Sequence, residues 1–108
     1  MSPKKSGIPP RCCTLDISGK DQEQLANMFK AVGNPVRLEI IKFLVTHPGC
    51  ITGDIVRHLP IAQATVSQHL KVLKEAGWIS GAIEGTATCY QLDTKRIAWF
   101  RAVINDIF

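Results

Sequence analysis

Two adjacent cysteines, Cys12 and Cys13, are the residues of this chain whose type and spacing most clearly suggest chemistry. Neighbouring Cα atoms lie only about 3.8 Å apart, which is closer than an unstrained disulfide prefers. The pair is therefore better suited to binding a soft, thiophilic ion than to forming a mutual disulfide. Two further cysteines, Cys50 and Cys89, are candidates for additional thiol ligands.

The adjacent pair lies in an arm, residues 1–18, which we expect to precede a single folded domain, residues 19–108. Hydrophobic residues make up 45% of the chain and charged residues 20%, which indicates a globular protein rather than a disordered one. We expect no membrane association, because no apolar run approaches spanning length. The basic start lacks the apolar segment of a secretory signal. We therefore expect a cytoplasmic protein with reduced thiols.

Helical periodicity covers the first part of the domain. Apolar positions recur every three or four residues over 20–32 and over 35–45, and Gly33, Asn34 and Pro35 mark the boundary. In the second helix we expect the inward-facing residues to be Leu38, Ile41, Leu44 and Val45. We expect a third, short helix that has Thr52 as its N-cap and ends near residue 59, and a fourth helix over 63–77.

Two apolar segments, residues 78–83 and 88–92, flank a short loop and predict a β-hairpin. A last helix, capped by Asp93 or Thr94, runs to the C-terminus. The expected fold class is mainly α with a β-hairpin wing: a winged helix-turn-helix in which four helices precede two strands and a final helix. We expect no enzyme, because a thiol enzyme needs an anion cradle around its cysteine or a Cys-x-x-Cys pair, and neither is present.

The fourth helix separates an apolar face from a polar one. Val66, Leu70 and Leu73 form a narrow stripe that we expect to face the core, with His69 packed at its flank as a structural histidine. The outer face and its flanks carry Gln63, Ala64, Ser67, Gln68, Lys71 and Lys74. Glutamine and serine can hydrogen-bond base edges, and lysine can bind phosphates. An ordinary solvated face has a similar composition, but the preceding helix, the tight turn and the hairpin favour DNA binding.

The last helix is apolar on most of its circumference. A terminal helix can bury only one side against its own small domain, so the surplus apolar surface indicates an interface. We expect a homodimer formed by this helix and the first one. Two-fold symmetry would then place two recognition helices about 34 Å apart, which suits an inverted repeat in double-stranded DNA. The net charge of +4 is compatible with such a partner.

Strand alternation predicts how the later cysteines face. Tyr90 and Leu92 are expected to point inward, so Cys89 would point outward. By the same alternation Ile51 would point inward and Cys50 outward, which would make Cys50 and Cys89 cross-strand neighbours. For each of these two cysteines the alternative is a small buried hydrophobic residue.

Two stretches carry a resemblance to a known family. Residues 29–41, Phe-Lys-Ala-Val-Gly-Asn-Pro-Val-Arg-Leu-Glu-Ile-Ile, and residues 62–71, Ala-Gln-Ala-Thr-Val-Ser-Gln-His-Leu-Lys, together resemble the ArsR/SmtB family of metal-sensing repressors. The resemblance covers roughly residues 12–92 and implies a homodimer that represses its own operon and leaves DNA when a toxic metal or metalloid binds. The family's Cys-Val-Cys motif on the third helix and its His- and Asp-rich zinc site on the last helix are absent.

The pair in the arm is similar to that of the arsenic-responsive branch of the family. This resemblance implies As(III) or Sb(III) as inducer, bound by Cys12, Cys13 and a third thiol. In that branch the third thiol comes from the partner subunit. In this chain we expect the third thiol to be Cys50, with Cys89 as an alternative or fourth thiol. No organic cofactor is expected. The alternatives are a Cd(II)- or Pb(II)-sensing repressor that uses all four thiols, a thiol-redox sensor without metal, and a DNA-binding module with inert cysteines.

Overall fold

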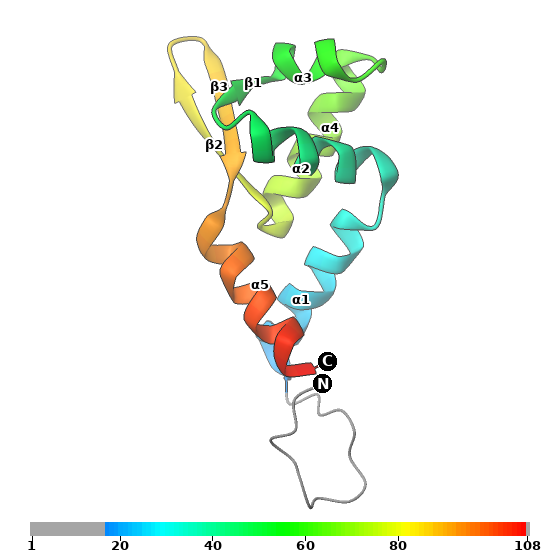
Figure 1. Ribbon diagram of the computed structural model, residues 1–108, viewed down its shortest axis with the longest axis vertical. Helices are drawn as coiled ribbons and strands as arrows, with labels where there is room; N and C mark the ends of the chain where they lie inside the picture. The colour runs from blue at the N-terminus through cyan, green and yellow to red at the C-terminus, as the bar shows by residue number, and fades with distance from the viewer. Residues whose placement is uncertain (1–16, 108) are drawn as a thin grey trace, which may run out of the picture.

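The computed structural model describes residues 17–107, so Cys12 and Cys13 lie outside the described residues. In this part of the chain the elements are α1 (Gly19–Val32), α2 (Pro35–Thr46), β1 (Cys50–Ile51), α3 (Thr52–His58), α4 (Gln63–Ala76), β2 (Ile79–Glu84), β3 (Ala87–Leu92) and α5 (Thr94–Ile107). Figure 1 shows α2, α3 and α4 beside a small sheet at one end, with α1 and α5 at the other end. The expected winged helix-turn-helix is confirmed, and β1 joins the hairpin as a third strand.

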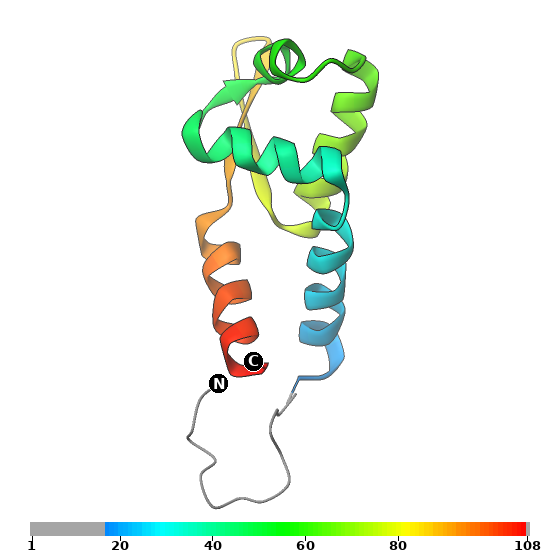
Figure 2. The ribbon, with the colours of Figure 1, turned by 45° about the vertical axis from the view of Figure 1, so that its right-hand side comes forward.

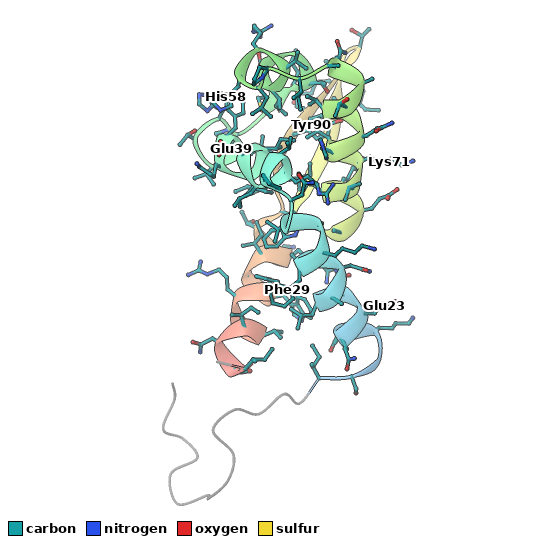
Figure 3. All side chains as sticks on the ribbon, turned by 90° about the vertical axis from the view of Figure 1, so that its right-hand side faces the viewer. Glu23, Phe29, Glu39, His58, Lys71 and Tyr90 are labelled. Carbon is teal, nitrogen blue, oxygen red and sulfur yellow. The ribbon has the colours of Figure 1, made fainter. Side chains whose placement is uncertain are left out.

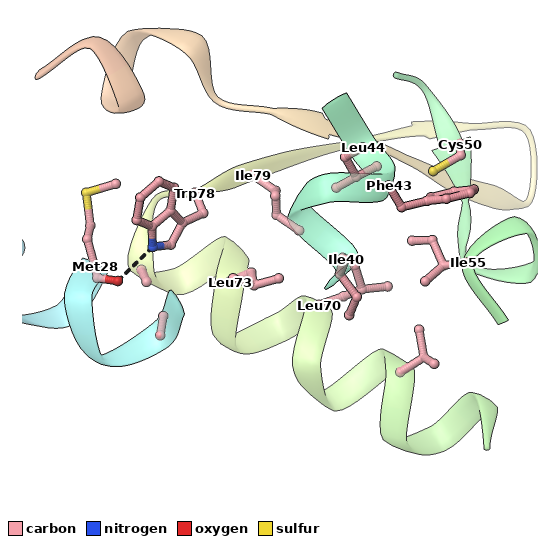
Figure 4. Packing of buried hydrophobic residues seen from close by; sticks show 13 residues of the cluster. Met28, Ile40, Phe43, Leu44, Cys50, Ile55, Leu70, Leu73, Trp78 and Ile79 are labelled. Carbon is pink, nitrogen blue, oxygen red and sulfur yellow. Dashed lines mark hydrogen bonds between the residues drawn. The ribbon is translucent and has the colours of Figure 1, made fainter. Parts of the chain in front are cut away.

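The core lies between α1, α2, α3, α4 and the first residues of β2. The largest fully buried side chains, most of them drawn in Figure 4, are Met28, Ile40, Leu44, Ile55, Val66, Leu70, Leu73 and Ile79. The buried indole of Trp78 donates its Nε1–H to the Met28 carbonyl at 2.8 Å. This bond satisfies two polar groups inside the core and connects the start of the wing to α1.

The boundary between α1 and α2 follows the expected capping chemistry. The Asn34 side chain accepts hydrogen bonds from the backbone N–H groups of Val36 and Arg37 at 2.9 and 3.1 Å. Pro35 occupies the first helical position, where a missing N–H has no consequence. The start of α2 is thus set by local sequence.

The buried face of α2 differs from the expected one. Leu44 is buried as expected, but its neighbours in the core are Ile40 and Phe43. Leu38 and Val45, expected to face inward, are 47% and 61% exposed. The helix is apolar around most of its circumference, so periodicity alone does not select the side that packs.

The helix-turn-helix consists of α3 and α4, joined by residues 59–62. The N-cap of α3 is Ile51 rather than the expected Thr52, and the Asp54 carboxylate accepts the Ile51 N–H at 3.0 Å. Helix α4 ends at Gly77, which has a left-handed backbone with φ of 98°. A side chain there would be strained and would approach Arg96 at 2.9 Å, so glycine is required at this turn.

The sheet has the strand order β1-β3-β2, and all pairs are antiparallel. Cys50 lies opposite Tyr90, and Ile51 lies opposite Cys89. Cys50 is buried and Ile51 is 36% exposed, so the expected orientation of these two residues was wrong. Paired residues share a face of a sheet, and Tyr90 faces the core. Cys50 therefore points inward, whereas Cys89 points to the opposite side.

Helix α5 leaves the sheet and runs beside α1, away from the other elements (Figure 2). Asp93 is its N-cap, because its side chain accepts the Arg96 N–H at 3.0 Å. The Phe100 ring packs edge-on against Phe29 and Trp78, with centroid distances of 5.2 and 4.8 Å. Among residues 17–107, no helix has both the length and the apolar character needed to cross a membrane.

Candidate nucleic-acid interface and thiol positions

Helix α4 presents the two faces that its sequence predicts. Val66, Leu70 and Leu73 are buried in the core. The six residues expected to contact DNA are all exposed on the other side: Gln63, Ala64, Ser67, Gln68, Lys71 and Lys74. Figure 3 shows Lys71 projecting away from the body of the domain. The structure thus leaves this face of α4 open to a partner.

The exposed face of α4 has a polar, uncharged first half, and its second half carries two lysines and Glu75. The side chains of Gln63, Ser67 and Gln68 can reach base edges in a major groove, where amides and hydroxyls distinguish base pairs. The N-cap residue, Ala62, makes no side-chain hydrogen bond to the first turn. The N–H groups of that turn are therefore open to an anion such as a phosphate. Lys71 and Lys74 add positive charge further along the helix.

The wing contributes little positive charge. A two-residue turn, Gly85-Thr86, connects β2 to β3, and Gly85 has a φ of 65°. The strand ends beside it carry the Glu84 carboxylate and the 80% exposed side chain of Ile83. A carboxylate at the wing tip repels phosphate, so the lysines of α4 are better placed to supply the phosphate contacts.

His69 is a packed histidine, as expected, and it has a partner that the sequence did not indicate. Its Nδ1 lies 3.2 Å from Nη1 of Arg37, and Arg37 Nε donates to the Ala31 carbonyl at 2.6 Å. Burial, followed by the positive charge of Arg37, lowers the pKa of His69. The sequence carried no clear signal for this pairing, because the apolar pattern of α2 did not show that Arg37 lies on the same side of the helix as the buried Ile40 and Leu44.

The two described thiols face opposite sides of the sheet. Cys50 is 8% exposed and lies beside Phe43 (Figure 4). Burial, and then the Asp54 carboxylate, raises the pKa of its thiol. Cys89 is half-buried, and its Sγ donates to Glu84 Oε1 at 3.5 Å. Partial burial and the bond to Glu84 raise the pKa of Cys89 as well.

The positions of Cys50 and Cys89 limit how the described residues could bind a thiophilic ion. Cys50 and Cys89 are not cross-strand partners, and no group of three histidine, cysteine or acidic side chains within residues 17–107 is arranged to hold a metal. The described residues therefore do not form an As–S₃ site by themselves. Cys12 and Cys13 would have to supply two of its three ligands.

Helices α1 and α5 carry apolar surface that residues 17–107 leave exposed or half-buried. Phe29 is 45% exposed, although its ring contacts Phe100. No described residue of α5 is fully buried, and its half-buried residues include Ile97, Trp99, Phe100, Val103, Ile104 and Ile107. This surface is typical of a helix that completes its burial against a second chain.

Known proteins are similar to this chain in both sequence and fold. The family model for bacterial regulatory proteins of the arsR family matches residues 34–80. An uncharacterized HTH-type transcriptional regulator of Methanocaldococcus jannaschii is 33% identical over 85 residues, which cover 79% of this chain and 96% of that protein. The transcriptional repressor SdpR of Bacillus subtilis is 37% identical over 84 residues, covering 73% and 91% of the two chains.

Two solved structures show the same architecture. A crystal structure of a possible transcriptional regulator for arsenical resistance has a TM-score of 0.66 at 28% identity, covering 73% of this chain and 81% of that chain. The homodimeric winged helix-turn-helix DNA-binding domain of a possible ArsR-family regulator from Mycobacterium bovis has a TM-score of 0.67 at 24% identity, covering 85% and 87%. Together with the exposed polar face of α4, these similarities show that the chain belongs to the ArsR/SmtB family of winged helix-turn-helix DNA-binding transcriptional repressors.

Proposed function

We propose that this repressor binds an inverted repeat as a homodimer and is released when As(III) or Sb(III) binds Cys12, Cys13 and Cys50. The observation that carries the proposal is the adjacent thiol pair placed just ahead of an ArsR-family DNA-binding domain. Trivalent arsenic takes three sulfur ligands in a pyramid, and two neighbouring thiols supply two of them at little entropic cost. Similarity to a possible regulator for arsenical resistance supports the same inducer. The proposed location is the cytoplasm, where thiols remain reduced.

The protonation of the described thiols favours trivalent arsenic over a divalent cation. Arsenous acid, As(OH)₃, condenses with three neutral thiols: three As–S bonds form, three As–O bonds break, and each thiol proton leaves in a water molecule. Cd(II) and Pb(II) instead need thiolates, and their binding releases protons. The raised pKa values of Cys50 and Cys89 oppose the second reaction but not the first.

The position of Cys50 suggests how binding would weaken the contact with DNA. Its thiol points into the core from β1, an edge strand that leads directly into α3. To reach a ligand ion, the side chain must turn outward, and this movement disturbs β1 and the capping bond between Ile51 and Asp54. The ion would then favour a conformation in which the helix-turn-helix is displaced, and such a difference between two states is what release requires.

The proposed dimer forms through α1 and α5. Their uncovered apolar surface includes Phe29 and most of the outer face of α5. The similar domain from Mycobacterium bovis is a homodimer. In a two-fold dimer the two α4 helices would meet successive major grooves about 34 Å apart, which explains the expected preference for an inverted repeat.

The decisive experiment measures operator binding by the reduced dimer with and without arsenite. Cys12→Ser and Cys13→Ser, separately and together, should retain DNA binding and lose release. We expect As(III) to bind at about one per protomer, because three thiols saturate it. Normal release of the double variant by arsenite would refute the proposal. Parallel titrations with Cd(II), Pb(II) and the thiol oxidant diamide test the alternative inducers.

A matched pair of variants tests the third ligand. Cys50→Ala should abolish release by arsenite, whereas Cys89→Ala should leave most of it. Alanine is used because it removes the sulfur without adding a hydroxyl group to the core. The reverse result, with Cys89 indispensable and Cys50 silent, would move the site to the outer face of the wing sheet.

A further inference from the structure

We infer that Arg37 is a positioning residue for operator binding, which holds the recognition helix α4 at a fixed angle to α1 and thereby sets the spacing between the two recognition helices of the dimer. The inference rests on DNA binding by α4 and on the proposed dimer through α1 and α5. It does not depend on the identity of the inducer.

The guanidinium of Arg37 bridges three helices. Arg37 belongs to α2; its Nε donates to the Ala31 carbonyl in the last turn of α1 at 2.6 Å, and its Nη1 lies 3.2 Å from Nδ1 of His69 in α4. The backbone of Arg37 is itself held, because the Asn34 side chain accepts its N–H at 3.1 Å. The arginine therefore starts from a fixed point and reaches both neighbouring helices.

The bridge requires a neutral histidine. A guanidinium can only donate hydrogen bonds, so Nδ1 of His69 must accept and the ring proton must reside on Nε2. Burial of the ring and the adjacent positive charge both favour this neutral form. Gln68 directly precedes His69 in α4, and its exposed side chain belongs to the proposed base-reading face. The bridge thus holds the helix at the position where it meets DNA.

The bridge adds to the apolar packing that buries Val66, Leu70 and Leu73 of α4 in the core. A pocket of about 440 Å³, open to solvent, lies beside the bridge, and Arg37 lines it together with Asn27, Lys30, Ala31, Val72, Glu75 and Ala76. A second hydrogen bond between α1 and α4 lies at the other end of α4, where Gln24 Nε2 donates to the Ala76 carbonyl at 2.8 Å. His69 and Ala76 are separated by about 10 Å along the helix axis. The two hydrogen-bonded points add to the constraint that the apolar stripe places on the direction of α4, so loss of the Arg37 bridge should allow a small rotation about the Ala76 end.

A small pivot has a large effect at the DNA. Gln63, at the start of α4, lies about 20 Å along the axis from Ala76. A rotation of about 10° about the Ala76 end would therefore move Gln63 by about 3.4 Å, which equals the rise of one base pair. In a two-fold dimer both helices would move, so loss of the bridge should relax the preference for one half-site spacing.

The test compares full-length dimers on three duplexes by fluorescence anisotropy: a single half-site, the inverted repeat selected by the wild type from random DNA, and the same repeat with one base pair inserted at its centre. The variants are Arg37→Lys, Arg37→Gln, His69→Ala and His69→Asn. Lys42→Gln is the control, because it removes a positive charge from the exposed side of the same helix. Circular dichroism and sedimentation confirm the fold and the dimer.

We expect the wild type to prefer the selected repeat over the inserted one by about tenfold. Arg37→Lys, Arg37→Gln and His69→Ala should reduce this preference to about twofold and leave half-site affinity unchanged. Lys42→Gln should behave like the wild type. His69→Asn should retain most of the preference, because the asparagine oxygen can accept the Arg37 bond at the position of Nδ1.

Two results would overturn the inference. If Arg37→Lys keeps the full spacing preference, charge rather than the two-sided bridge is what matters. If Arg37→Gln weakens half-site and full-site binding by the same factor, Arg37 contacts DNA directly. If the arginine variants fail to form dimers, the ratio of affinities for the selected and the inserted repeat, measured for His69→Ala, tests the inference instead. A wild type that selects no duplex from random DNA would instead refute DNA binding through α4, on which the inference rests.

Discussion

Replacing Gln68 and Lys71 separately should distinguish base recognition from phosphate binding on one helix face. Both side chains are exposed on α4, so their removal should leave the folded domain intact. Gln68→Ala should remove one base contact from each protomer. At about 1–3 kcal/mol per contact, the dimer should lose about 2–6 kcal/mol on its operator, or at least about 30-fold in affinity. Its affinity for unrelated DNA should not change.

Lys71→Ala should show the opposite pattern. Each phosphate contact contributes about 0.9 to the slope of log affinity against log salt concentration, so the loss of one lysine from each protomer should reduce the magnitude of that slope by about 1.8. Affinity should fall on operator and unrelated DNA alike. Anisotropy titrations at several salt concentrations measure both quantities, with Lys42→Ala as an exposed lysine control on α2. If Gln68→Ala leaves the ratio of specific to non-specific affinity unchanged, the recognition face has been misplaced.

The stability of the fold should depend on pH and on the buried thiol. Burial, and then the positive charge of Arg37, lowers the pKa of His69 in the folded protein. The contribution of His69 to stability should therefore be complete above about pH 6.5 and lost as pH falls below that value. Urea unfolding of His69→Asn should show a weaker dependence of stability on pH in this range. Cys50→Ser should cost about 1–3 kcal/mol of unfolding free energy, because it places a hydroxyl group in the apolar core. Cys89→Ser should cost much less, and equal losses for both cysteines would contradict the difference in burial.

Local sequence was sufficient to predict most element boundaries and the exposed face of α4. Asn34 and Pro35 begin α2 because a side-chain cap and a missing N–H act within one turn of the helix. Gly77 ends α4 because its left-handed backbone excludes side chains. The outward face of α4 follows from the alternation of apolar and polar residues along fourteen positions, which leaves only one way to bury Val66 and Leu73.

Tertiary structure decided which side of a short or uniformly apolar segment faces the core. β1 has two residues, too few for an alternating pattern, so its pairing with β3 determined that Cys50, opposite Tyr90, points inward. Helix α2 is apolar on most sides, so packing against α1, α4 and the sheet selected Ile40 and Phe43 for the core and left Val45 exposed.

The bridge made by Arg37 depends on three helices at once. Its partners Ala31 and His69 lie six residues before it and thirty-two residues after it in sequence. A guanidinium can occupy a half-buried position only where acceptors from other elements arrive at hydrogen-bonding distance. The sequence alone determined that an arginine stands in the first turn of α2. Only the packing of α2 against α1 and α4 decided that this arginine would face the two neighbouring helices and join them.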